Sequence, residues 1–164
     1  MMRPRRPGRR PTTSTVGPHR QLDQRSPEDI SGELARRVIA LDGVEEGVSQ
    51  VSVASSRAIF LTDVLRESDP RTSLAPGQRL EPVHLHGIED TSLHAVLPPE
   101  VGAEMVRLGW GEAHQYEDFG TEFMIYGPRN AVELEIVMSL IQESLAFALA
   151  AQPDPPQPRP GPTS

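Results

Sequence analysis

Residues 82–96 decide the fold, and they read Pro82-Val83-His84-Leu85-His86-Gly87-Ile88-Glu89-Asp90-Thr91-Ser92-Leu93-His94-Ala95-Val96. Alternating apolar and polar side chains on both sides of a Gly- and Asp-containing turn predict two short strands that form a hairpin. Successive side chains of a strand point to opposite faces. His84 and His86 therefore share one face, and Leu85 lies on the other.

The length of the turn decides which face carries the third histidine. With a loop of five residues, His84 lies opposite His94, and Leu85 lies opposite Leu93. A loop of four residues would slip the pairing by one residue and move His94 to the apolar face. Because the first register matches leucine with leucine, we expect His84, His86 and His94 on a single face.

The chain on both sides of the hairpin predicts an α+β domain. Ser26-Pro27-Glu28-Asp29 is typical of a helix start, and apolar residues continue at helical spacing up to Gly43. The remaining expected elements are strands at 48–54, 57–61 and 121–126, loops at 63–81 and 112–120, and helices at 98–108 and 130–150. This order predicts a single domain with an antiparallel sheet and helices packed mainly on one face.

Both ends of the chain differ in composition from this domain. Residues 1–25 are rich in Arg and Pro and residues 151–164 are rich in Pro, so we expect disordered tails around a domain at 26–150. The first 26 residues carry seven Arg and one Asp, whereas residues 27–150 carry eight Arg and twenty-one acidic residues, a net charge of −13. His19 is then an idle residue of the first tail.

The composition also excludes several kinds of site. The 164 residues include no Cys and no Lys, which excludes disulfides, thiolate metal ligands and Schiff-base chemistry. An acidic domain is a poor partner for nucleic acid. No apolar run reaches the roughly 18–20 residues needed to cross a bilayer. We expect a cytoplasmic protein with no nucleic-acid or membrane partner.

The histidine face is the strongest candidate site, because imidazole acts as an acid or a base near neutral pH. The expected catalytic residues are His84, His86, His94 and His114. Arg57 and Arg129 are expected to hold an anionic substrate, and Trp110 to stack on a planar one. The alternatives are a core position for Trp110 and an ion pair between Arg129 and Glu133.

The same face offers a set of metal ligands. Three histidines, or two with Asp90 or Glu112, suit Zn²⁺ or non-haem iron. Our first expectation is no cofactor, and the alternative is a divalent metal at His84, His86 and His94. Without a metal, Glu112 is expected to be a solvated surface acid.

Several of these motifs, taken in order, resemble the fungal luciferase family. They are His84-Leu85-His86, Leu93-His94, Gly109-Trp110-Gly111, His114 and Tyr126-Gly127-Pro128-Arg129. The resemblance covers about 55–147, most of the expected domain. It adds Tyr126 to the expected substrate-binding residues Arg57, Trp110 and Arg129.

The luminescent members of that family oxidise a hydroxylated α-pyrone with molecular oxygen and no added organic cofactor. The resemblance therefore implies a cofactor-independent, oxygenase-like enzyme whose substrate is small and enolisable or aromatic, with molecular oxygen as the second reactant. Because the loop after His114 is shorter here, we expect a non-luminescent relative with a different substrate. The alternative is a non-catalytic module of the same fold that binds a small ligand.

Overall fold

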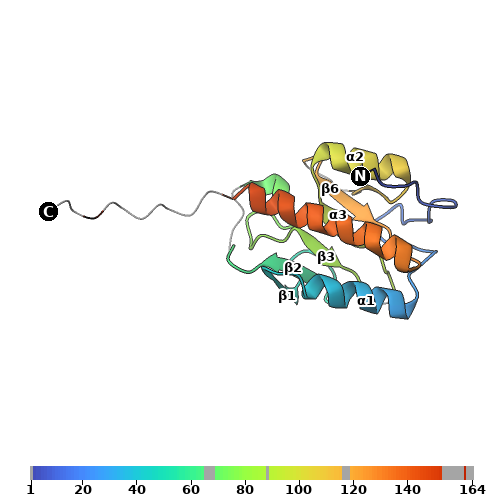
Figure 1. The fold of residues 1–164 in the computed structure, drawn as a ribbon, viewed down its shortest axis with the longest axis horizontal. Coiled ribbons are helices and arrows are strands. Elements are labelled where there is room, and N and C mark those ends of the chain that lie inside the picture. The colour runs from blue at the N-terminus through green and yellow to red at the C-terminus, as the bar shows by residue number, and fades with distance from the viewer. Residues whose placement is uncertain (1, 65–68, 88, 116–118, 153–160, 162–164) are drawn as a thin grey trace.

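A six-stranded antiparallel sheet forms the centre of the protein (Figure 1). The computed structural model describes residues 2–64, 69–87, 89–115, 119–152 and 161. The strands are β1 (Val44–Val48), β2 (Arg57–Leu61), β3 (Val83–Leu85), β4 (Leu93–Val96), β5 (Gly111–Ala113) and β6 (Glu122–Ile125). Their order across the sheet is β1-β2-β3-β4-β6-β5. Consecutive strands are therefore neighbours in the sheet except β4 and β5, because β6 lies between them.

Helices cover one face of this sheet. They are α1 (Glu28–Ile39), α2 (Pro99–Leu108) and α3 (Ala131–Ala150), and a short 3₁₀ helix, η1, spans Pro70–Thr72. Figure 1 shows α1 and α3 side by side across the sheet, with α2 at the end that carries β5 and β6. This arrangement confirms the expected single α+β domain with an antiparallel sheet and helices mainly on one face.

The last helix supplies much of the core. Asn130 caps it, because its side-chain oxygen accepts a hydrogen bond from the Glu133 amide at 3.0 Å. The Glu133 carboxylate accepts a hydrogen bond from the Arg129 amide at 2.8 Å. Leu140 and Ile141 are fully buried against the sheet.

The hairpin at residues 82–96 has the expected register. His84 pairs with His94, and Leu85 pairs with Leu93. Both leucines belong to the core beneath the helices. Side-chain parity then directs His84 and His94 to the opposite face of the sheet.

Two strand boundaries differ from the expectation. The first strand lies at Val44–Val48, whereas residues 49–56, expected to be largely extended, form a loop. The Ser49 hydroxyl accepts the amides of Val51 and Ser52, and such local bonds compete with strand pairing. The second difference is β5, a three-residue strand inside the expected loop at 112–120.

The N-terminal segment corrects the expected disordered tail at 1–25. Residues 2–25 lie along the domain, where Pro4 O accepts the Trp110 indole N–H at 2.7 Å and the Arg6 amide bonds Leu108 O at 2.9 Å. The tail prediction was wrong because it considered apolar burial alone, whereas this segment is held by polar and charged groups. Of the other expected tail, 151–164, residues 153–160 and 162–164 lie outside the described part of the chain.

The segment also turns back on itself before α1. A bridge between Thr13 and Gln21 and two flanking backbone hydrogen bonds make a small hairpin. Gln21 is fully buried, and its side-chain oxygen accepts the Gly127 amide at 2.9 Å. The segment therefore supplies the hydrogen-bond acceptor for the Gly127 amide of the domain.

We expect Leu140→Ala to lower the free energy of unfolding by about 2–5 kcal/mol, the usual range for a leucine truncated in a packed core. Urea unfolding followed by circular dichroism measures the loss. Leu149→Ala is the matched control in the same helix, because Leu149 is 59% exposed. Equal losses in the two variants would show that α3 does not pack as described.

Gln21→Ala should lower the free energy of unfolding by about 1–3 kcal/mol, because it leaves the buried Gly127 amide without an acceptor. The neighbouring exposed residue provides the control, Arg20→Ala, for which we expect little change. A chain lacking residues 2–23 that melts within a few degrees of the full chain would restore the tail interpretation.

Candidate functional site

All five histidines of the chain meet on the face of the sheet opposite the helices. They are His19, His84, His86, His94 and His114, and we call them the histidine cluster. His94 is central: its ring centroid lies 4.5 Å from those of His86 and His114, 5.0 Å from that of His84 and 5.8 Å from that of His19. The structure therefore brings together the four histidines expected from the sequence and adds His19.

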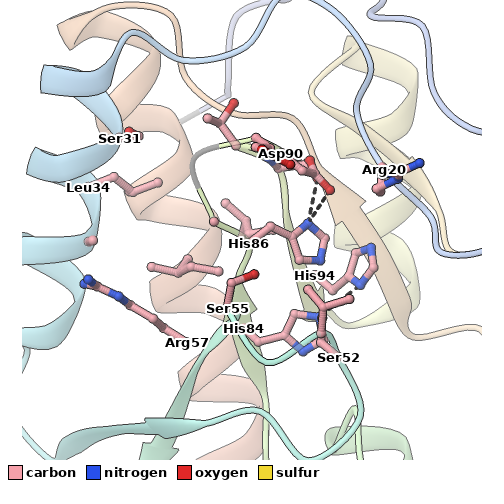
Figure 2. A pocket seen from close by; sticks show the side chains of 18 of the residues that line it. Arg20, Ser31, Leu34, Ser52, Ser55, Arg57, His84, His86, Asp90 and His94 are labelled. Atoms are coloured by element: carbon pink, nitrogen blue, oxygen red, sulfur yellow. Dashed lines mark hydrogen bonds and ion pairs between the residues drawn. The ribbon is translucent and has the colours of Figure 1, made fainter.

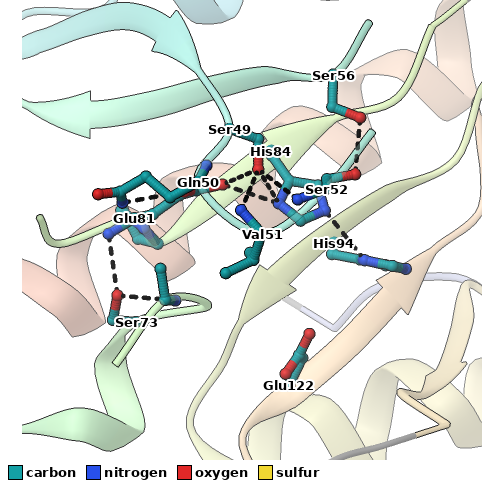
Figure 3. A network of polar contacts seen from close by, with 12 residues as sticks. Ser49, Gln50, Val51, Ser52, Ser56, Ser73, Glu81, His84, His94 and Glu122 are labelled. Atoms are coloured by element: carbon teal, nitrogen blue, oxygen red, sulfur yellow. Dashed lines mark hydrogen bonds and ion pairs between the residues drawn. The ribbon is translucent and has the colours of Figure 1, made fainter. Parts of the chain in front are cut away.

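The buried carboxylate of Glu81 orients His84 and, through it, His94 (Figure 3). Glu81 is 0% exposed and accepts hydrogen bonds from the Ser49 hydroxyl at 2.6 Å and the Gln50 amide at 3.0 Å. Its Oε1 lies 3.0 Å from His84 Nδ1. His84 Nε2 in turn lies 3.1 Å from His94 Nδ1, so a chain of hydrogen bonds runs from Glu81 through His84 to His94.

The protonation state of Glu81 determines which ring nitrogens of His84 and His94 carry protons. Burial alone would raise the pKa of Glu81, but hydrogen bonds from His84, Ser49 and Gln50 hold it below the ordinary value. An ionised Glu81 only accepts, so His84 carries its proton on Nδ1. His84 Nε2 then accepts from His94 Nδ1, which leaves the lone pair of His94 on Nε2.

Burial keeps the central imidazoles neutral. It lowers the pKa of His84, and it lowers that of His94 well below the ordinary value, with neighbouring histidines adding to the effect. Burial lowers the pKa of His114 to about 4, and the neighbouring imidazoles of His19 and His84 add to the effect. Neutral rings offer lone pairs, which a base or a metal ligand requires.

His86 has a carboxylate of its own. Its Nδ1 lies 2.9 Å from Asp90 Oδ2 and 3.0 Å from the Ser92 hydroxyl. Burial would raise the pKa of Asp90, but its hydrogen bonds to His86 and Ser92 outweigh burial and lower it. The His86 side chain is 6% exposed, slightly more than the 3% of His84, and it lines the cavity described below (Figure 2).

A third carboxylate binds the histidine of the N-terminal segment. His19 Nε2 lies 2.5 Å from Glu112 Oε1, and the Tyr126 hydroxyl donates to Glu112 Oε2 at 2.9 Å. Burial and the charge of Glu112 raise the pKa of Tyr126 to about 12. The expectations of an idle His19 and a solvated Glu112 were therefore wrong. No local pattern marked His19, because its partner lies 93 residues away.

An open cavity of about 1670 Å³ lies beside the histidine cluster (Figure 2). All five histidines of the cluster, Asp90 and apolar side chains of α1 line it. Arg57, expected to hold substrate, lies at its rim on β2, with Nε 3.3 Å from Glu46 Oε1. Arg20 of the N-terminal segment lies at the opposite side, a cation that the sequence analysis did not identify.

The other three expected substrate-binding residues lie away from this cavity. Trp110 is 1% exposed in the core, and Arg129 pairs with Glu133 at 2.5 Å, as their alternative interpretations had it. Tyr126 is buried and approaches the cluster only through Glu112. Around Trp110, Gly109 has a φ of 87°, and a Cβ on Gly111 would lie 2.2 Å from Met124 O, so this motif serves tight backbone packing.

Two sets of three histidines have ligand atoms close enough to share a metal ion. They are His84 with His86 and His94, as considered from the sequence, and His19 with His94 and His114. In each set, one ring nitrogen of every residue lies within 4.8 Å of the others. The two sets share His94.

Residues 79–144 match the protein family described as Luciferase domain. Over 88% of its length the chain is 30% identical to a luciferase of Armillaria gallica and 29% identical to one of Armillaria mellea. Over 56% it is 28% identical to a luciferase of Neonothopanus nambi. The resemblance to fungal luciferases is thereby confirmed.

These relatives are longer than the chain, which spans 60% of the length of the two Armillaria proteins. No solved structure matches the chain. None of the helices in the described residues has the length and apolar character required to cross a membrane.

The histidine cluster should make stability depend on pH. A histidine whose pKa is lower in the folded state binds a proton more readily when unfolded, so stability falls as pH drops below the unfolded value of about 6.5. With a folded pKa of about 4, His114 alone should remove about 2 kcal/mol between pH 7 and pH 5.

Urea unfolding at both pH values, in buffer containing a chelator, measures this loss. Burial also lowers the pKa of His84 and of His94, so these two residues add to the loss of stability as pH falls. His114→Gln should therefore reduce the pH dependence without abolishing it. An unchanged pH dependence in that variant would mean that His114 is not neutral in the folded protein.

Proposed function

We propose that the chain is an oxygenase-like enzyme whose histidine-lined cavity takes a small enolisable or aromatic substrate, with molecular oxygen as the second reactant. The observation that carries the proposal is the His86–Asp90 pair beside the cavity. The similarity to fungal luciferases supports molecular oxygen as the second reactant.

In this proposal His86 is the general base. Its Nδ1 donates to Asp90, so the lone pair of the neutral ring is on Nε2. When Nε2 takes a proton from the substrate, the carboxylate of Asp90 stabilises the imidazolium that forms. His84 is less suited to this role because both of its nitrogens are already in hydrogen bonds.

The charges around the cavity favour the product of that step. Loss of a proton converts an enol into an electron-rich enolate, which can react with molecular oxygen without an organic cofactor. Arg57 and Arg20 line the cavity from opposite sides and stabilise a negative charge between them. Leu34 of α1 adds an apolar wall on which an aromatic ring packs.

His86→Gln and Asp90→Asn should each lower kcat/KM for oxygen consumption, the former by roughly 10²-fold or more, the usual effect of removing a general base. An oxygen electrode measures the rate with candidate α-pyrones and catechol-like enols. Glu89→Gln is the control, because it removes a carboxylate from the same turn at an exposed position.

Two results would count against the proposal. Binding of these compounds without oxygen consumption would favour the alternative, a non-catalytic module that binds small ligands. Full activity of His86→Gln would place the base on another residue.

A further inference from the structure

Two ring nitrogens of the histidine cluster are buried and unsatisfied. Within the described part of the chain, His19 Nδ1 and His94 Nε2 have no hydrogen-bond partner. His19 is 4% exposed and His94 is 5% exposed. Buried polar atoms nearly always have a partner, since leaving one without costs about 1–3 kcal/mol. Two such atoms on neighbouring rings point to a bound ligand.

The protons on these two rings are placed so that both unsatisfied nitrogens carry lone pairs. Glu112 accepts from His19 Nε2, so a neutral His19 has its lone pair on Nδ1. Glu81 acts through His84 to place the proton of His94 on Nδ1, which leaves the lone pair on Nε2. Lone pairs without a donor attract a cation.

His114 completes a set of three. One of its ring nitrogens lies within 4.8 Å of one nitrogen each of His19 and His94. Bonds of about 2.0–2.1 Å from a tetrahedral metal place its ligand nitrogens about 3.4 Å apart. Small rotations of the three side chains therefore suffice to enclose an ion.

We propose that His19, His94 and His114 form a binding site for a divalent transition metal such as Zn²⁺, an ion that three imidazole ligands commonly bind. Three protein ligands leave a fourth tetrahedral position for water or for a ligand from the cavity. Carboxylates lie behind the ligands, as is usual for metal-binding histidines: Glu112 behind His19, and Glu122, with Oε1 3.6 Å from Nε2, beside His114.

The other set of three histidines fits an ion less well. His84 Nε2 and His94 Nδ1 share a hydrogen bond, and His86 Nδ1 is held by Asp90. Both ring nitrogens of His84 are in hydrogen bonds, so an ion that binds His84 has to break one of them. At His19 Nδ1 and His94 Nε2 it breaks none.

The metal site does not depend on the proposed reaction. His86, the base of that reaction, is not among the three ligands. A chain that binds Zn²⁺ but consumes no oxygen would support the site and contradict the enzyme, so the two proposals fail separately.

Calorimetric titration of the chelator-treated full chain with Zn²⁺ tests the site. We expect one ion per chain, and loss of stoichiometric binding in His19→Gln, His94→Gln and His114→Gln. Glu112→Gln should weaken binding by about 10–100-fold, the usual effect of removing a carboxylate behind a ligand. His86→Gln is the matched control from the same cluster and should retain the affinity of the unsubstituted chain.

X-ray absorption of the unsubstituted chain loaded with Zn²⁺ tests the site without relying on any variant to fold. It should show three imidazole nitrogens at about 2.0–2.1 Å. Absence of stoichiometric binding, or unchanged affinity in His19→Gln, would overturn the proposal. Loss of binding in His86→Gln together with retention in His19→Gln would assign the ion to the other set.

Discussion

The hydrogen bond between the Glu81 carboxylate and His84 is the interaction on which the site depends. A carboxylate with no exposed surface is stable only when charge-assisted hydrogen bonds replace its hydration. Ser49 and Gln50 supply three of these bonds, and they fix the loop at 49–56 beside the sheet. His84 supplies a further bond, and its orientation determines which nitrogen of His94 carries the proton. The Glu81 carboxylate therefore determines both the position of the loop at 49–56 and which nitrogen of His94 carries the proton.

The histidine cluster is divided in function by its carboxylates. Asp90 orients His86, which lines the cavity and whose remaining nitrogen suits proton transfer. Glu112 orients His19, and Glu81 orients His94 through His84. The remaining nitrogens of His19 and His94 are buried and suit a cation. Five chemically identical side chains thus acquire different roles because each has a different acceptor behind it.

Local patterns in the sequence predicted the hairpin register and the last helix, because side-chain parity and helical periodicity involve near neighbours. The same parity placed His84, His86 and His94 on one face. Patterns could not identify Glu81, which lay in an expected loop and is distinguished only by burial. They could not identify His19 either, because Glu112 is 93 residues away and the composition around His19 indicated disorder. Trp110 and Arg129 belong to a recognisable motif, but a motif does not determine where a side chain points.

Because the N-terminal segment supplies His19, the site is assembled from two parts of the chain, this segment and the domain that carries the other four histidines. A segment tethered to its own binding surface acts as an intramolecular ligand, at an effective concentration in the millimolar range. Among its contacts with the domain, Arg3 forms ion pairs with Glu104 and Glu143. Ions in solution screen contacts of this kind. Ionic strength therefore acts on one of the contacts that hold His19 beside His94, whereas the buried hydrogen bonds of Pro4 and Gln21 with the domain are not screened in this way.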